Sequence, residues 1–481
     1  MRPIVRYLIG HFLMLEGIFL LVPLFVAIYD REPAVNIFAF GFAAVLAGLS
    51  GWLLSRRKPV QNTLYAKDGL ILCSLTWIAF SLIGSLPIWI NGDFPLFIDA
   101  FFEIVSGFTT TGATVQANVE GCARSTLFWR SFTHFIGGMG VLVFSLAILP
   151  ATTTEGSVFM AKAEMPGPSF SKISARLSDV ARILYAIYTG MTIVLTGLLI
   201  AFGMNGFDAL CHAMGTAGTG GFSTRAASVG AYDSVAIQTT IGIFMLLYSV
   251  NFNLYYLLLL GRTKDFFKNT ELHGFFRMVG ISIVLIYLVN YGFTWNGRNL
   301  LNVFFSVSTL ASSTGYVTVD YDVWPLFSQL ILIGIMFVGA CGGSTGGGLK
   351  VSRVQVLIKS SFQELKQIRN PNRVQVLRYE GETLEGTKLR SILLYFGMFT
   401  IIFVTGLLII SLDVTDFRSA FSTVLTAISN MGPGLGTMGP TEHMQSLSIV
   451  SKITMCALMI TGRLEIWPVL ILFSRKTWRN T

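Results

Sequence analysis

The sequence is poor in charge, and its cysteines form no recognisable pattern. Charged residues make up only 12% of the 481 residues, which is about half the share found in soluble globular domains. A chain with so little charge cannot cover itself with an ordinary water-facing surface. The five cysteines are odd in number, widely scattered and without the spacing of a metal site, so they indicate neither a disulfide framework nor a zinc centre.

The short motifs of enzymes are also missing. There is no HExxH, no nucleophile elbow and no clustered pair of acids. The glycine-rich stretch 342–352 fails the spacing of a phosphate-binding loop because Leu349 separates Gly348 from Lys350,. Gly434, Gly436 and Gly439 match GxGxxG, but no predicted strand precedes them,. We therefore predict no enzymatic activity.

Hydrophobic sequence dominates instead. Hydrophobic residues make up 53% of the chain and its mean hydropathy is +0.66, which indicates a multi-pass membrane protein. Apolar windows long enough to cross a bilayer cover residues 4–29, 35–54, 69–91, 126–150, 180–203, 234–260, 276–293, 324–348, 390–411 and 444–473. The first window is too long for a secretion signal and is followed at once by further spans. Shorter apolar segments at 96–108, 206–217, 300–312 and 417–430 are predicted to be re-entrant helices,.

The basic residues indicate the orientation. They gather near the N-terminus, at 56–58, at 262–268, at 350–390 and near the C-terminus, all on one side of the predicted topology. By the positive-inside rule this side is cytoplasmic and carries both termini. The opposite loops are sparse and largely acidic, which suits the entry of cations. The net charge of +9 is therefore a topology signal, and no nucleic-acid partner is needed to explain it.

The order of elements repeats four times after two leading helices. Each unit contains a span, a short re-entrant helix, a glycine loop and a second span, so all the repeats start on the same side of the membrane. The predicted fold is an all-α polytopic membrane protein with four parallel helix, pore-helix, helix repeats in a pseudo-fourfold, channel-like arrangement. The expected divisions are 1–60 for the leading helices and 61–150, 151–265, 266–385 and 386–481 for the repeats.

The glycine loops are the candidate selectivity filter. Glycine lets backbone carbonyls turn toward an axis and replace the water shell of a cation. Close helix packing is the alternative use of such glycines, but their recurrence in the same place of every repeat favours a pore. The candidate filter residues are Thr110, Thr111, Gly112, Thr219, Gly220, Gly221, Ser313, Thr314, Gly315, Gly432, Pro433 and Gly434.

A second glycine-rich stretch is the candidate gate. Residues 324–361 would form a helix of ~57 Å, but the many glycines in its middle make an unbroken helix improbable. We expect a loop that lines a cavity at membrane depth, and the alternative is a flexible linker at the membrane exit. The candidate gate residues are Gly342, Gly343, Ser344, Thr345, Gly346, Gly347 and Gly348.

Arg463 is the most unexpected charge in the sequence. It precedes Arg475 by ~18 Å along a predicted apolar helix,, which places it near mid-membrane, where an arginine normally faces protein or water and has a function. We interpret it as an electrostatic barrier in the pore. Pairing with Glu465 or another acid is the alternative. Glu103, Arg130 and His134, in contrast, are expected to be structural hydrogen-bonding groups.

Several separated motifs carry a family resemblance. FTTTGATV, GTGGFST, SSTGYVT, NMGPGLGTMGP, RSFTHFIGGMGV and CGGSTGGGLK resemble the potassium-translocating subunit of the Trk/Ktr/HKT superfamily, and most of all its bacterial TrkH type. The resemblance implies filter glycines at Gly112, Gly221, Gly315 and Gly434, a gate loop beneath the filter, and a pore-facing Arg463. In plant members a serine at the first glycine position accompanies sodium preference, so Gly112 favours potassium.

The resemblance also implies partners and a location. We expect a homodimer in the bacterial inner membrane, regulated by a cytosolic nucleotide-binding ring of the TrkA type. Potassium would occupy the filter, and ATP or NADH would bind only to the ring. The expected function is gated potassium uptake driven by the membrane potential. A sodium- or proton-coupled potassium symporter and a non-conducting membrane scaffold are the alternatives.

Overall fold

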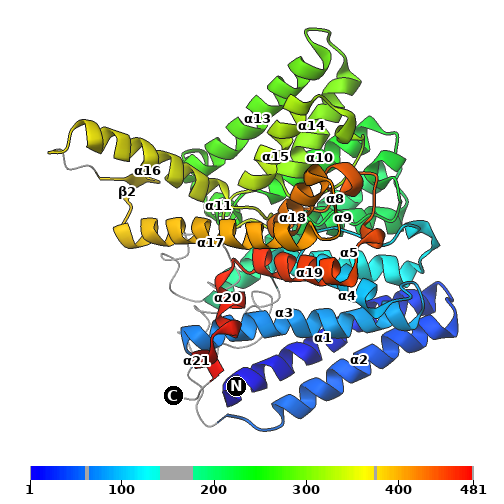
Figure 1. The fold of residues 1–481 in the computed structure, drawn as a ribbon. Coiled ribbons are helices and arrows are strands. Elements are labelled where there is room, and N and C mark those ends of the chain that lie inside the picture. Colours follow the sequence, from blue (N-terminus) through cyan, green and yellow to red (C-terminus); the bar gives the residue numbers. More distant parts are fainter. Residues whose placement is uncertain (1, 60–63, 141–176, 373–375, 479–481) are drawn as a thin grey trace.

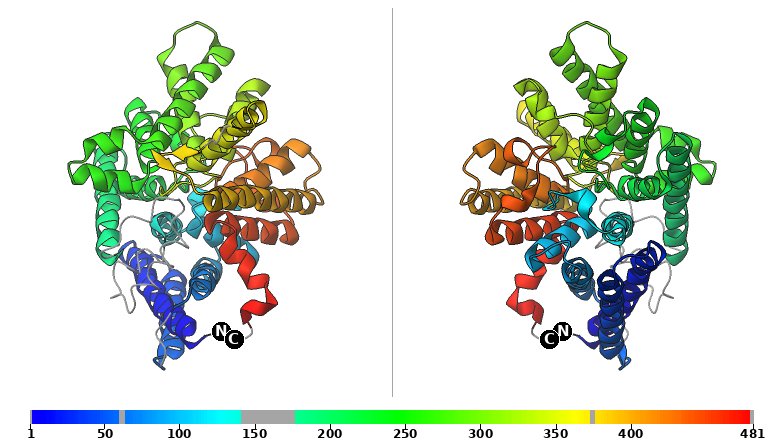
Figure 2. Two further views of the ribbon diagram at one scale, coloured as in Figure 1. Left: turned by 90° about the vertical axis from the view of Figure 1, so that its left-hand side faces the viewer. Right: turned by 90° about the vertical axis from the view of Figure 1, so that its right-hand side faces the viewer.

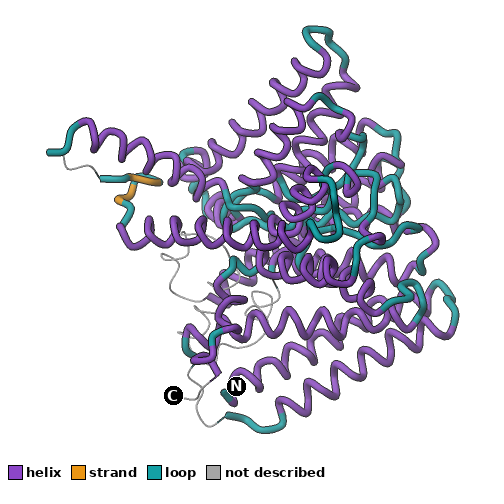
Figure 3. The backbone as a smooth tube through the Cα atoms, viewed as in Figure 1, coloured by secondary structure: helices purple, strands orange, loops and turns teal. Residues whose placement is uncertain are grey.

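The computed structural model describes residues 2–59, 64–140, 177–372 and 376–478, and nearly all the regular structure in these ranges is helical (Figures 1 and 3). The chain begins with a hairpin of two long helices, α1 (Pro3–Tyr29) and α2 (Ala34–Ser55). These helices touch where Gly10 faces Gly51: a Cβ on Gly10 would lie 2.6 Å from the carbonyl oxygen of Gly51, and a Cβ on Gly51 would lie 2.5 Å from that of Gly10. The absence of side chains at these two positions therefore sets how closely the helices pack.

Four repeats follow the hairpin. Their long first helices are α3 (Ala66–Ile90), α8 (Leu177–Ala201), α13 (Thr270–Tyr291) and α17 (Gly386–Ile410). Their pore helices are α4 (Phe97–Phe108), α9 (Gly206–Gly218), α14 (Gly297–Ala311) and α18 (Phe417–Ser429). Their second helices begin as α5 (Arg124–Met139), α10 (Val235–Tyr248), α15 (Leu326–Val338) and α19 (Ile449–Arg463). Figure 2 shows the repeats around a common centre, with the hairpin of α1 and α2 outside them.

In the described residues, the predicted spans 234–260 and 444–473 are not continuous helices, because α10 ends at Tyr248 and α19 ends at Arg463. Within the described residues, six helices are long and apolar enough to cross a membrane, namely α1, α2, α3, α8, α13 and α17. α10 is followed, after a bend of 89°, by α11 (Phe252–Leu259) and then by α12 (Thr263–Phe267). The end of the predicted span 126–150 and the predicted repeat boundary at residue 150 lie outside the described residues.

The other breaks have a visible backbone cause. α15 stops before Gly339, whose φ of 71° is left-handed, and the chain resumes as α16 (Val351–Arg369) only after the glycine-rich stretch. The predicted break within 324–361 is therefore confirmed. α19 ends at Arg463 because Glu465 and Ile466 adopt φ of 57° and 68°, a conformation that ends a right-handed helix. Short helices α20 (Trp467–Leu470) and α21 (Arg475–Trp478) complete the chain.

A small extension lies on the side of the molecule where both termini are found. α16 and the antiparallel strands β1 (Arg378–Tyr379) and β2 (Glu382–Thr383) project to the left in Figure 1. Many residues on this extension are charged or exposed. It is connected directly to the glycine-rich loop, because α16 begins where that loop ends.

The contact between α1 and α2 makes a prediction about stability. Gly51→Ala should lower the free energy of unfolding by about 1–3 kcal/mol, because the new methyl group overlaps backbone that cannot move aside. Gly48→Ala on the same helix is the matched control, since nothing lies within 4 Å of its Cβ position, and it should raise stability by about 0.5–1 kcal/mol. Thermal unfolding of both purified variants in detergent is the measurement. Equal midpoints would contradict the packing argument.

Candidate ion pathway

Each pore helix ends in the same backbone shape. Just after the helix, one residue adopts a left-handed φ between 52° and 58°, which turns the chain back toward the centre. The four residues in this position are Thr110, Thr219, Ser313 and Asn430. The residue two places further on is a glycine in every repeat, namely Gly112, Gly221, Gly315 and Gly432. Each pore helix is therefore followed by an equivalent backbone segment, and the four segments lie close together.

The four segments meet backbone to backbone. A Cβ on Gly112 would overlap the carbonyl oxygen of Gly220, and a Cβ on Gly221 would overlap that of Thr314. A Cβ on Gly315 would lie 2.8 Å from the ring of Pro433 and 3.1 Å from the nitrogen of Gly432. A Cβ on Gly432 would lie 2.9 Å from the carbonyl oxygen of Gly112, which closes the ring. Side chains are excluded at these positions, so the ring is formed by backbone.

In the fourth segment, the glycine at the equivalent backbone position differs from the one expected from the sequence. Counting from the left-handed residue places Gly432, rather than Gly434, beside Gly112 and Gly315. Gly434 instead donates its N–H to the carbonyl of Met438, 2.8 Å away and further along the segment. The signal was present in the sequence, because Asn430 occupies the same place relative to its glycine as Thr110, Thr219 and Ser313. Asn is a residue that tolerates left-handed φ.

Buried polar side chains hold the segments in place through hydrogen bonds. Glu103, Arg130 and His134 are among them and have the structural role expected from the sequence. Arg130 Nη2 lies 2.7 Å from Glu103 Oε1, and both side chains are almost fully buried. Glu103 also accepts a hydrogen bond of 3.1 Å from the N–H of Val115, just after the first segment. His134 Nδ1 lies 2.7 Å from the carbonyl of Gly107, while the N–H of Phe222 donates to His134 Nε2. This last pair of contacts ties the first repeat to the second.

Asn430 is a supporting residue that the sequence reasoning missed. Its side-chain amide donates to Thr111 Oγ1 at 3.2 Å and to the carbonyl of Met459 at 2.8 Å. It therefore links the first filter segment to α19, four residues before Arg463. An amide can make these two contacts at once, whereas the hydroxyl groups of the other repeats have a single donor hydrogen.

A cavity of about 130 Å³ lies on one side of the glycine ring. Its lining includes all four ring glycines and the acid Glu442. Arg130 and Arg225 also line it, but Arg130 is paired with Glu103 and Arg225 lies 3.3 Å from Asp208. The cavity wall is therefore less acidic than the loop composition suggested, and its arginines are already matched by carboxylates.

The candidate gate residues lie on the other side of the ring. The N–H of Gly347 donates to Ser313 Oγ at 2.6 Å, so the loop touches the third filter segment directly. A Cβ on Gly347 would overlap the carbonyl oxygen of Ser429 at the end of the fourth pore helix. Thr345 Oγ1 donates to the carbonyl of Tyr248 at 3.2 Å, beside the break between α10 and α11. The loop therefore packs at membrane depth against pore elements, which argues against an ordinary linker.

Arg463 contacts this loop. Its guanidinium donates to the carbonyl of Thr345 at 2.7 Å and to the carbonyls of Gly137 and Gly138 at 2.5 and 2.6 Å. Arg463 is the last residue of α19. The sequence had suggested a position halfway along a helix, and the structure does not bear this out. Glu465, the alternative partner considered for Arg463, forms an ion pair of 2.7 Å with Arg353 on α16.

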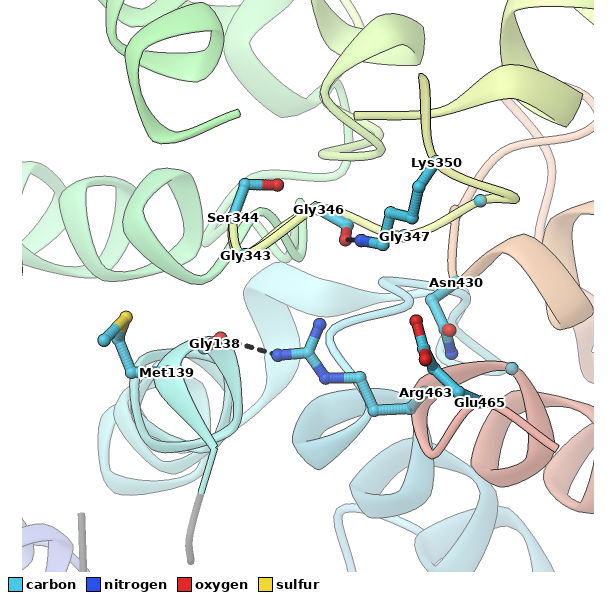
Figure 4. A pocket seen from close by; sticks show the side chains of 12 residues that line it. Gly138, Met139, Gly343, Ser344, Gly346, Gly347, Lys350, Asn430, Arg463 and Glu465 are labelled. Carbon is cyan, nitrogen blue, oxygen red and sulfur yellow. Dashed lines mark hydrogen bonds between the residues drawn. The ribbon is translucent and has the colours of Figure 1, made fainter. Parts of the chain in front are cut away.

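The space between the loop and Arg463 is very small. The pocket there measures about 20 Å³ (Figure 4), which is room for about one water molecule. Figure 4 shows Arg463 reaching across it toward Gly138, while Lys350 turns toward the carbonyl of Gly346. Asn430 and Glu465 also line the pocket. The pathway below the glycine ring is therefore constricted, and two cationic side chains lie at the constriction.

This architecture defines a class: multi-pass helical membrane proteins in which four parallel repeats surround one pathway. Within that class, the chain belongs to the TrkH family of cation transport proteins, whose family model matches residues 33–480. It is therefore a transport protein and not an enzyme. It is 34% identical to the Trk system potassium uptake protein TrkG of Escherichia coli (strain K12) over 99% of both chains.

Two further relatives agree. The chain is 35% identical to the Trk system potassium uptake protein TrkH of the same organism, covering 100% of this chain and 99% of the relative. The crystal structure of the potassium transporter TrkH from Vibrio parahaemolyticus is similar with a TM-score of 0.88 and 29% identity, over 99% of each chain. The similarity thus extends over the repeats and the leading hairpin together.

The buried ion pair of Arg130 and Glu103 leads to a second prediction. Arg130→Ala should lower the free energy of unfolding by about 3–5 kcal/mol, because it leaves the buried Glu103 carboxylate without its partner. Arg124→Ala is the control: its pair with Asp30 is half exposed, and its loss should cost no more than about 1 kcal/mol. Thermal unfolding in detergent distinguishes them. A similar loss in both variants would refute the structural role of the buried pair.

Proposed function

We propose that the chain takes up potassium through a gated, channel-like pore. The proposal rests on the closed ring of four segments, in which the Cβ position of each ring glycine faces the backbone of the next segment. The Cβ position of Gly315 also faces the ring of Pro433. Backbone carbonyls are suited to replace the water shell of a cation. Curated relatives over the full length are named potassium uptake proteins, which supports potassium as the cargo. The filter is proposed to hold potassium ions and to need no other cofactor.

The proposed filter comprises the four segments 110–112, 219–221, 313–315 and 430–432. Gly112, whose counterpart is serine in sodium-preferring plant members, favours potassium over sodium. The repeats are proposed to divide near residues 60, 150, 265 and 385. These divisions put one pore helix and one filter segment in each unit.

The proposed gate consists of residues 342–348, and Arg463 is the proposed electrostatic barrier. The pocket of about 20 Å³ between them supports a closed resting pore. Opening is proposed to be controlled by a cytosolic nucleotide-binding ring, with ATP or NADH bound to that ring alone. The basic stretch 350–390 continues directly from the gate and is a suitable surface for such a partner.

The setting is proposed to be the bacterial inner membrane, in a homodimer. Both termini lie on the side from which α16 projects (Figure 1), and the basic loops favour a cytoplasmic position for that side. With this orientation, the cavity of about 130 Å³ beside the glycine ring would face the outside. The membrane potential supplies ~2.3 kcal/mol per charge per 100 mV for entry.

Ion flux through the purified protein in liposomes tests the function. We expect potassium and rubidium flux driven by an imposed potential, with a reversal potential that ignores sodium and proton gradients. A reversal potential that follows either gradient would indicate a coupled symporter. No potassium or rubidium flux from folded protein, at any imposed potential, would favour a non-conducting scaffold.

The filter assignment predicts a change in selectivity. Gly112→Ser and Gly432→Ser place a side chain where backbone approaches backbone, so both should lower the potassium-to-sodium permeability ratio. Gly434→Ser is the matched comparison on the same segment and should leave the ratio unchanged, since Gly434 lies outside the ring. Permeability ratios from reversal potentials are the measurement. If only Gly434→Ser altered the ratio, the original assignment of Gly434 would be right.

The barrier assignment predicts an increase in flux. At ~7 Å and an effective dielectric constant of ~20, Arg463 repels a cation by about 2 kcal/mol. Arg463→Gln keeps hydrogen-bond donors but removes the charge, so rubidium flux should rise severalfold while the order of ion preference stays the same. Arg463→Lys keeps the charge and should remain close to the parent. If Arg463→Lys raised rubidium flux as much as Arg463→Gln, the barrier would depend on the hydrogen bonds of Arg463 and not on its charge.

A further inference from the structure

One carboxylate holds both ends of the glycine-rich loop. Glu271 Oε1 accepts a hydrogen bond of 2.7 Å from the N–H of Gly342 and one of 3.0 Å from the N–H of Ser352. Gly342 starts the loop and Ser352 lies in the first turn of α16. Glu271 itself stands at the start of α13 and is only 6% exposed. A single oxygen atom therefore joins the two ends of segment 342–352.

The carboxylate also replaces the missing cap of α16. Lys350 precedes this helix with a left-handed φ of 78°, and its ammonium group donates to the carbonyl of Gly346. A lysine side chain has no acceptor, so it cannot cap the N–H groups of the helix. The first N–H groups of a helix need acceptors, and the partial positive charge there favours an anion. Hydrogen bonds to a charged acceptor are also stronger than neutral ones. The negative charge of Glu271 therefore has a physical reason to stay at this position.

A second carboxylate continues the arrangement toward the projecting extension. Glu380, in the turn between β1 and β2, accepts hydrogen bonds of 2.9 and 3.1 Å from the N–H groups of Thr270 and Glu271. In the same region Tyr379 donates to Gln355 Oε1 at 3.0 Å, and Gln355 donates to the carbonyl of Thr270 at 3.3 Å. The hairpin is thus bonded both to the start of α13 and to α16.

We propose that Glu271 is a positioning residue that holds the glycine-rich loop against the pore, and that the hairpin bearing Glu380 sets its position. Displacing the hairpin removes the two hydrogen bonds that Glu380 accepts at the start of α13, shifts Glu271 and releases both ends of the loop. The proposal rests on the gating role of residues 342–348. It adds that a displacement of Glu380, on the exposed hairpin, is transmitted to the loop through Glu271. The hairpin is accessible to a cytosolic protein.

Two readouts test the proposal on the full-length protein. In Glu271→Ala, amide hydrogen exchange across 342–352 should be at least about tenfold faster, because both end contacts are lost. Basal rubidium flux without any partner should rise by about threefold or more. Glu271→Gln retains an acceptor oxygen and should restore much of the protection. Combining Glu271→Ala with deletion of 342–348 should give no more flux than the deletion alone.

The controls separate this proposal from its alternatives. Glu380→Ala changes an exposed residue, so it tests the same chain of contacts if Glu271→Ala does not fold, and it should speed exchange at 342–352. Glu364→Ala, an exposed carboxylate on α16, should match the parent. Parental exchange in both Glu271→Ala and Glu380→Ala would overturn the proposal. Exchange does not depend on conduction, so a parent protein without flux would refute the proposed function alone.

Discussion

The structure depends on one constraint: backbone that leaves a helix at membrane depth must find its partners inside the protein. The four segments after the pore helices meet this constraint by packing on one another, which is possible only where Cβ atoms are absent, as at Gly112 and Gly221. The same four glycines therefore bring the segments together, and they are the residues on which the proposed coordination of a cation by backbone carbonyls depends.

The breaks in the second helices obey the same constraint with different partners. The N–H of Cys341 donates to the carbonyl of Ser249 at 3.1 Å, and the N–H of Phe252 donates to that of Gly343 at 3.0 Å. These contacts join the break of the second repeat to that of the third. Arg463, at the break of the fourth, satisfies carbonyls of the first and third repeats. The broken helices of the second, third and fourth repeats thus bond to backbone groups of other repeats.

The sequence predicted the repeat order, the re-entrant helices and the position of the glycine-rich loop, because length, hydropathy and glycine content are local properties. It could not predict the ends of α10 and α19, since Ser249 and Glu465 are ordinary residues whose conformation is fixed by tertiary contacts. Two glycines flank Pro433, and the choice of Gly434 over Gly432 did not use the spacing from Asn430, which matches the spacing in the other repeats. Glu271 has no local signal at all: its partners lie 71 and 81 residues away.

The number of contacts on the glycine-rich loop limits how it can move. Hydrogen bonds reach it from Ser313, Tyr248, Glu271 and Arg463, and each contributes about 1 kcal/mol or more when a charge is involved. The coupling free energy between a bound effector and a distant site is typically about 1–3 kcal/mol, so a partner can break only a few of these contacts at once. If the loop is the gate, as proposed, its full release would exceed this coupling free energy. A displacement that starts at the two ends, where one carboxylate carries both contacts, requires the fewest bonds to change.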